Sequence, residues 1–102
     1  DNQGSALQPE KFRLGNNYPN PFNPETTIEF SVPKQSGVVF KIYNILGEEM
    51  YRMQDENLSS GVYRVIWNGA NKFGVQVPSG IYFYQLKAGD SFIQTKKMTL
   101  LK

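Results

Sequence analysis

The side chains that could carry acid–base chemistry in this 102-residue chain are two pairs of adjacent carboxylates, Glu48-Glu49 and Asp55-Glu56. Adjacent residues of an extended chain point to opposite sides, so neither pair brings its two carboxyl groups together. We therefore interpret both pairs as solvated loop charges. The chain contains no His and no Cys, which removes the usual general base, the commonest metal ligand and every Ser/His or Cys/His nucleophile. We predict no catalytic residues and expect the protein not to be an enzyme.

The loop over residues 68–74 could supply oxygen ligands to a metal ion. Asn68 and Asn71 could contribute side-chain oxygens to Ca²⁺, but calcium sites normally recruit carboxylates and this loop has none. Asx turns, in which the side chain bonds to the backbone two residues on, explain both Asn residues more simply. We predict no metal and no cofactor, and a calcium site in this loop stays as the alternative.

Aromatic residues make up 14% of the chain, and exposed aromatic rings can form a sugar-binding platform or a protein-docking surface. Most of the rings fall on the expected core faces of strands. Tyr43, Tyr51, Phe73 and Phe83 remain, too few and too dispersed along the sequence to define a platform. An accessory adhesion or carbohydrate-binding module of a secreted enzyme is therefore the alternative function, and a small-molecule ligand is not expected.

The charges are nearly balanced and scattered along the chain. Eleven Lys and Arg face nine Asp and Glu, and no run of like charge is longer than Lys96-Lys97. This pattern argues against an electrostatically bound nucleic acid or membrane partner. No apolar run approaches the roughly 20 residues of a membrane span, so direct membrane insertion is not expected. The length suits one domain, which we place at residues 12–102 after a flexible linker at residues 1–11.

The most strand-like stretch is residues 79–86, which lies between two turn signals and is rich in aromatic and β-branched side chains. Alternation places Tyr82, Tyr84 and Leu86 on a core face. Ile81 and Phe83 fall on the second face, which we expect to be at least partly covered. In the alternative, these two residues are exposed as part of a docking patch.

Six further strands are expected, spaced about ten residues apart with turns between them. A short edge strand begins near Phe12 and Leu14, and a polar loop at residues 53–61, anchored by Leu58, follows a short strand at Met50 and Tyr51. Turns are expected at residues 34–37 and 44–47, where Gly47 can take a positive φ. The remaining expected core positions are Ile28, Phe30 and Val32, then Val38, Phe40 and Ile42, then Tyr63, Val65 and Trp67, and finally Met98 and Leu100 in a last strand over residues 92–101.

This spacing, without helical periodicity, favours an all-β fold. We predict an Ig-like or fibronectin-type antiparallel β-sandwich of about seven strands, with a β-barrel as the alternative. Residues 15–24 contain three prolines within six positions, which excludes a helix or a paired central strand there. We expect a stiff, extended segment, named here the strap, that covers one open end of the core with Tyr18 and Phe22 as its anchors.

Several motifs in order resemble one known family. The motif at residues 17–24 followed by residues 26–30 resembles the start of the C-terminal sorting domain of type IX secretion system cargo. Residues 39–50 are similar to that family's strand, Leu-Gly turn and next strand. Trp67-Asn68-Gly69, Gly74, residues 79–86 and residues 96–102 complete the pattern, which also resembles the related Ig-like domain of the flagellar hook-capping protein. Asn stands at 68 and 71, where many relatives carry Asp.

The resemblance implies a domain at the C-terminus of a larger exported protein, secreted or held at the cell surface. Its partners would be the outer-membrane secretion machinery and the upstream cargo domain of the same chain. By analogy, the recognition elements are residues 18–24 of the strap and residues 96–102 of the last strand, and that strand could also present an edge for strand addition. The implied recognition residues are Tyr18, Pro19, Asn20, Pro21, Phe22, Lys96, Lys97, Met98, Leu100, Leu101 and Lys102.

Overall fold

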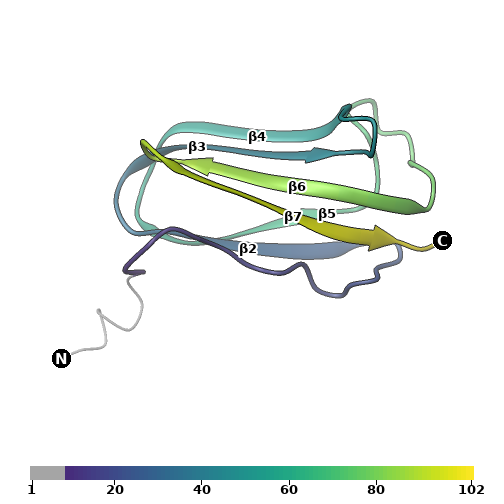
Figure 1. The fold of residues 1–102 in the computed structure, drawn as a ribbon, viewed down its shortest axis with the longest axis horizontal. Helices are drawn as coiled ribbons and strands as arrows, with labels where there is room; N and C mark the ends of the chain where they lie inside the picture. The colour runs from purple at the N-terminus through teal and green to yellow at the C-terminus, as the bar shows by residue number, and fades with distance from the viewer. Residues whose placement is uncertain (1–8) are drawn as a thin grey trace.

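Two antiparallel β-sheets pack face to face in the computed structural model, which describes residues 9–102 (Figure 1). One sheet has three strands in the order β1-β2-β5, and the other has four in the order β4-β3-β6-β7. The strands are β1 (Arg13–Leu14), β2 (Thr26–Val32), β3 (Ser36–Tyr43), β4 (Glu49–Leu58), β5 (Gly61–Trp67), β6 (Gly80–Ala88) and β7 (Phe92–Leu100). The predicted Ig-like sandwich is confirmed, and the two separate sheets rule out the barrel.

The linker expected over residues 1–11 falls mainly on residues 1–8, which lie outside the described residues. Residues 9–11 belong to no strand. Within residues 9–102, no helix has the length and apolarity needed to cross a membrane.

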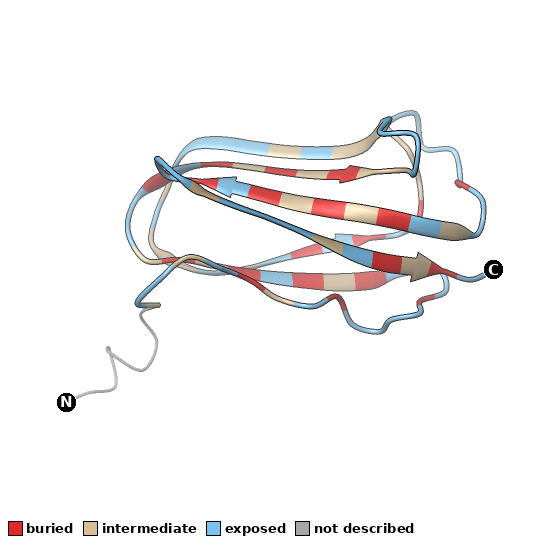
Figure 2. Ribbon diagram, in the orientation of Figure 1, coloured by how far each residue is buried: buried red, intermediate tan, exposed pale blue. Residues whose placement is uncertain are grey.

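The alternation of apolar and polar residues produces the core as predicted. Ile28, Phe30 and Val32 of β2 are buried, and their neighbours Glu29 and Ser31 face outward. β3 repeats the pattern with Val38, Phe40 and Ile42. Figure 2 shows this as red bands that alternate with paler ones along β2, β3 and β6. Each such side chain, fully buried, contributes about 1.5–3 kcal/mol to folding.

β6 is a central strand, hydrogen-bonded to β3 on one side and to β7 on the other. Tyr82, Tyr84 and Leu86 are buried against the opposite sheet, as predicted. The sandwich has only two layers, so the other face of β6 lies on the outside of the molecule. Neighbouring side chains leave Phe83 half-buried there, whereas Ile81 is exposed. We expected this second face to be at least partly covered by other side chains. That expectation holds for Phe83 and was wrong for Ile81.

Aromatic rings connect the two sheets at one end of the core. Trp67 of β5 packs with the edge of its ring system against Tyr82 of β6, with 5.3 Å between the ring centroids. Its indole N–H donates to the carbonyl of Ala70 at 2.8 Å, so the one polar atom of this buried side chain is satisfied. The prediction of a core Trp is confirmed.

The sequence prediction was wrong over residues 53–61, where β4 continues to Leu58 in place of a polar loop. β4 is the edge strand of its sheet, and its second half carries polar residues on both faces, which hides the period of two. Leu58 packs against the core as expected. The register of β3 and β4 shifts near Gly37, and β3 begins at Ser36, inside the predicted turn. β7 ends at Leu100, one residue earlier than expected.

Candidate interaction surface: the strap and the edge of β7

The strap joins the two sheets along one side of the sandwich. Tyr18 pairs through its backbone with Thr27 of β2, and Phe22 forms an isolated parallel bridge with Leu100 of β7. The chain therefore leaves the three-stranded sheet and crosses to the last residues of the four-stranded one (Figure 1). The peptide bonds before Pro19, Pro21 and Pro24 are cis.

Asn17, and not Tyr18, is the first anchor of the strap. Asn17 is buried, and its side-chain amide donates to Thr26 Oγ1 at 3.1 Å and to the carbonyl of Pro19 at 3.2 Å. The side chain of Tyr18 is 80% exposed. The predicted anchor was wrong because Tyr18 lies opposite Thr27, an outward position of β2, and paired residues of antiparallel strands place their side chains on the same face.

A buried tyrosine hydroxyl holds the start of the strap. The O–H of Tyr84 donates to the carbonyl of Gly15 at 2.8 Å, and the hydroxyl oxygen of Tyr84 accepts from the backbone N–H of Asn17 at 3.0 Å. Burial raises the pKa of Tyr84, and the hydrogen bond from Asn17 partly opposes that rise. Sequence analysis placed Tyr84 in the core but had no signal for the strap residues that its hydroxyl would meet.

Phe22 is the second anchor, as predicted. Its side chain is buried, with 5.8 Å between its ring centroid and that of Trp67. Its backbone N–H donates to the carbonyl of Thr99 at 3.0 Å, and its carbonyl accepts from the N–H of Leu101 at 2.9 Å. The side-chain oxygen of Asn20 accepts from the N–H of Thr99 at 3.1 Å. The strap therefore occupies the outer edge of β7 over residues 99–101.

The two elements implied as recognition segments, more than 70 residues apart in the sequence, thus lie side by side. Met98 and Leu100 are fully buried in the core, so a partner of the folded domain cannot contact their side chains. Phe22 is buried as well, and Lys96 is half-buried with its Nζ donating to Asn16 Oδ1 at 3.0 Å. The implied residues that remain exposed on this surface are Tyr18, Pro19, Asn20, Pro21, Lys97, Leu101 and Lys102.

The first half of β7 keeps an open edge. Alternate residues of an antiparallel strand direct their backbone N–H and C=O to the same side, and Thr99 directs its groups away from β6 toward the strap. Ile93, Thr95 and Lys97 share that direction. Within residues 9–102, no backbone group pairs with β7 on that side before Thr99. This stretch is therefore an available edge strand.

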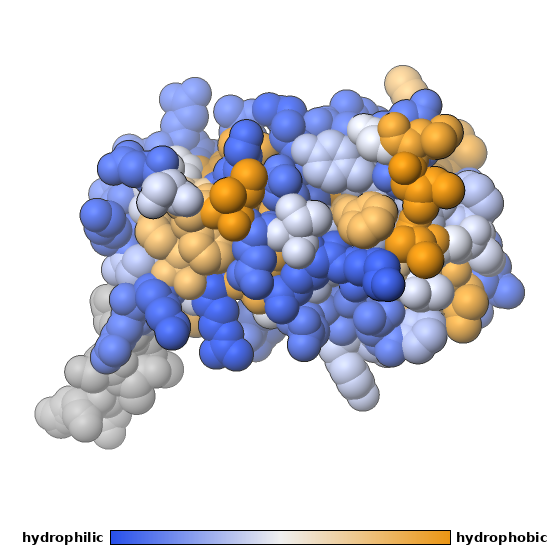
Figure 3. All heavy atoms as spheres, in the orientation of Figure 1, coloured by the Kyte–Doolittle hydropathy of each residue, from blue (hydrophilic) through white to orange (hydrophobic). Residues whose placement is uncertain are grey.

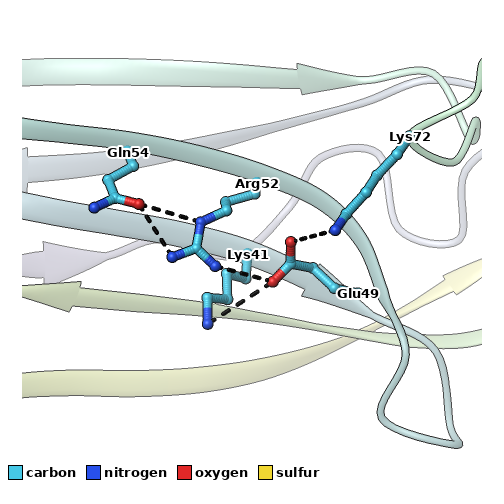
Figure 4. Close-up of polar contacts among 5 residues, drawn as sticks. All are labelled: Lys41, Glu49, Arg52, Gln54 and Lys72. Carbon is cyan, nitrogen blue, oxygen red and sulfur yellow. Dashed lines mark hydrogen bonds and ion pairs between the residues drawn. The ribbon is translucent and has the colours of Figure 1, made fainter.

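A group of charges lies at the opposite edge of the same sheet, around Glu49. Its carboxylate is 2.8 Å from Lys72 Nζ, 3.2 Å from an Arg52 guanidinium nitrogen and 3.8 Å from Lys41 Nζ (Figure 4). The hydrogen bond from Lys72 holds the pKa of Glu49 below its ordinary value, against the opposing effect of partial burial. Its side chain is only 18% exposed, so the prediction of a solvated loop charge was wrong for Glu49.

The side chains of the two Asn residues that could have bound a metal ion accept hydrogen bonds within their own loop. Asn68 accepts from the N–H of Ala70, and Asn71 accepts from the N–H groups of Phe73 and Val75, which confirms the predicted Asx turns. Gly47 has the positive φ expected of its turn, 83°. Within residues 9–102, no group of three or more acidic, His or Cys side chains is arranged to hold a metal ion.

Comparison with known proteins identifies a family over most of the chain. Residues 15–91 match the sequence profile of the FlgD Ig-like domain. No curated protein matches the sequence significantly.

Solved structures share the fold at low sequence identity. Dimeric latent PorU from Porphyromonas gingivalis is 19% identical over 89% of this chain, with a TM-score of 0.68. PorZ, a surface component of the type IX secretion system of that organism, is 24% identical over 98%, with a TM-score of 0.60. FlgD from Xanthomonas campestris is 16% identical over 97%, with a TM-score of 0.57. The chain spans only 9% of the PorU chain and 13% of the PorZ chain, but 74% of that FlgD chain.

Proposed function

The chain belongs to the FlgD Ig-like domain family, and from this premise we propose that it is a non-catalytic sorting and cell-surface attachment domain of a larger exported bacterial protein. Outer-membrane machinery of the type IX secretion system would recognise it, and an upstream cargo domain would precede residues 12–102. The protein carrying it would be secreted or held at the cell surface.

The observation that carries the proposal is the meeting of the strap with the end of β7. Two segments from opposite ends of the domain form one continuous surface only in the folded state, held by the hydrogen bonds of Phe22 and Asn20 to residues 99–101. Such a surface reports that the domain has folded. The fold shared with PorZ, a surface component of the type IX system, supports the same class of role.

The test is an export assay on surface residues of the folded domain. The full 102-residue chain is fused behind a signal peptide and a reporter in a bacterium with a type IX system. A truncation after Thr95 would remove the buried Met98 and Leu100 and would unfold the domain, so point variants are the better choice. We expect the triple variant Tyr18→Ser, Lys97→Gln, Lys102→Gln to reduce the reporter outside the cell about tenfold, as loss of a central anchor does.

The matched control changes one exposed aromatic residue and two exposed lysines elsewhere, as Phe73→Ser, Lys34→Gln, Lys11→Gln. It should export as the native fusion does. Equal export of the two triple variants, with both domains folded by thermal melting, would rule out this surface as the recognition element. Retention of the native fusion in the periplasm would reject the sorting function itself.

A further inference from the structure

The outer face of the four-stranded sheet places two aromatic side chains next to each other. Tyr43 of β3 and Phe83 of β6 are register partners, so their side chains leave the sheet on the same face. Both are half-buried, and neither belongs to the core between the sheets. The Nζ of Lys41 lies 6.0 Å from the centroid of the Tyr43 ring. The two rings form an apolar strip, and Val39, Ile81 and Ile93 are further apolar side chains of the same face.

Cations gather on the same face. Lys41 is the register partner of Arg52 in β4, and Lys97 of β7 is opposite Phe83. Lys87 is opposite Val39, two outward rows from Phe83 along β6. Lys72 reaches the face from its loop by pairing with Glu49 (Figure 4). The acidic residues on this face are Glu49 and, by strand alternation at the far end of β4, Glu56.

Five cations against two carboxylates leave an excess of three positive charges on this face, more than the net charge of +2 of the whole chain. The rest of the molecule is therefore close to neutral. Sequence analysis saw scattered charges because the cations come from four strands and a loop, and only the sheet register assembles them. Glu49 holds Lys41, Arg52 and Lys72 at one place. This group of three cations and one carboxylate therefore has an excess of two positive charges.

We propose that this face binds an acidic polysaccharide, with sugar rings packed on Tyr43 and Phe83 and carboxylates paired with Lys41, Arg52 and Lys97. The face is open to solvent because the sandwich has only two layers, so an extended polymer can lie along it. Amides and hydroxyls stand between the cations, including Gln85, whose Nε2 donates to Thr95 Oγ1 at 3.1 Å. These groups match the hydroxyls of a carbohydrate.

Charge spacing favours a polysaccharide over other polyanions. Neighbouring strands lie about 4.8 Å apart, so Arg52 and Lys97, on the two edge strands of this sheet, are separated by about 14 Å or more across the sheet. A nucleic acid strand binds mainly through a dense row of cations along its phosphates, and a face with an excess of three positive charges has no such row. An acidic peptide carries carboxylates but no flat ring to cover the aromatic pair. Lys97 belongs to both surfaces, so the variants below change Phe83 and Lys41, which the export test leaves native, and the readout is a binding equilibrium in solution.

The test is calorimetric titration of the full 102-residue chain with hexagalacturonate at low and at physiological salt. The matched ligand is the fully methyl-esterified hexamer, which keeps the sugar rings and removes the charge. We expect the acidic hexamer to bind at least about tenfold more tightly than its ester, and to bind more weakly as salt is added. Amide chemical shifts should move along β3, β6 and β7 on this face.

Two variants change residues of the binding face without removing core side chains, and the export test changes neither residue. Phe83→Leu and Lys41→Gln should each weaken binding about three- to tenfold, and Lys34→Gln, an exposed lysine outside this face, should leave it unchanged. Unchanged thermal melting verifies that each variant is folded. The proposal is overturned by absence of binding, by equal binding of the ester, by an equal effect of Lys34→Gln, or by tighter binding of hexaglutamate or hexathymidylate, which would assign the face to an acidic peptide or to single-stranded nucleic acid.

Discussion

Tyr84 shows how a single polar atom in the core positions a distant segment. Its hydroxyl contacts Asn17 and Gly15, which lie 67 and 69 residues earlier in the chain. The hydroxyl both donates and accepts, so it satisfies one backbone carbonyl and one backbone N–H that would otherwise be buried without partners. Within residues 9–102, every buried side-chain polar atom has a hydrogen-bond partner. Loss of this one oxygen would leave the backbone carbonyl of Gly15 and the backbone N–H of Asn17 without that partner.

We predict that Tyr84→Phe lowers the free energy of unfolding by about 1–3 kcal/mol, because two backbone groups of the strap lose their partner while the ring stays packed. Urea denaturation measures the change. Tyr18→Phe removes a hydroxyl from an 80% exposed side chain and should stay within about 0.5 kcal/mol of the native protein. Equal losses in the two variants would show that the Tyr84 hydroxyl does not stabilise the strap.

At the scale of elements, the strap covers the last part of the sheet edge that β7 leaves open. An edge strand exposes backbone groups that can pair with another chain, and here the strap covers the last of them. A side chain supplies part of the pairing, since Asn20 offers its amide oxygen to Thr99 where a regular strand would offer a carbonyl. The prolines of the strap cannot donate such bonds, so the contacts come from the residues between them.

We predict that Asn20→Ala accelerates hydrogen exchange of the Thr99 amide about fivefold, which corresponds to the roughly 1 kcal/mol of one hydrogen bond. The amide of Leu101, held by Phe22, should change less. Asn23→Ala is the control, because Asn23 is also an exposed Asn before a proline but its side chain makes no hydrogen bond within residues 9–102. Exchange of Thr99 that is the same in both variants would contradict the assignment of its acceptor to Asn20.

At the scale of the whole molecule, three groups with shifted pKa values, Glu49, Tyr82 and Tyr84, make the stability depend on pH. The pKa of Glu49 is lowered by Lys72 and its other cationic neighbours, so its contribution is present above the ordinary value of 4.5 and is lost as pH falls through the folded pKa. Burial raises the pKa of Tyr82 and of Tyr84, so their contribution is present below the ordinary value of 10.0 and is lost as pH rises through the folded pKa values.

We therefore predict a plateau of melting temperature between these two ordinary values, with a fall on each side. Glu49→Gln should flatten the acid side and leave the alkaline side unchanged. The loss at neutral pH should be below about 1 kcal/mol, because the ion pairs of Glu49 are with partners at the surface. Melting curves across the pH range measure both limbs, and an acid limb of the same slope in both proteins would exclude Glu49 as its source.

The sequence by itself determined the strands whose side chains alternate between a buried and a solvated face, such as β2 and β3, and the turns whose geometry depends on one residue, such as Gly47 and Asn71. These features follow from interactions between residues a few positions apart, so the local pattern contains the information. The burial of Trp67 was also predictable from the alternation of its strand, whereas Tyr18 and Phe22 were both expected as anchors and only Phe22 is buried.

Tertiary structure alone decided which distant segments meet. The length of β4 depends on pairing with β3, the exposure of Tyr18 depends on its register against Thr27, and the ion pairs of Glu49 depend on Lys72 from another loop. The same holds for the surface shared by the strap and β7 and for the cations gathered around Tyr43 and Phe83. Strand order and register create these neighbours, and no local pattern in a single sequence encodes them, because the pairing energy is shared among residues far apart in the chain.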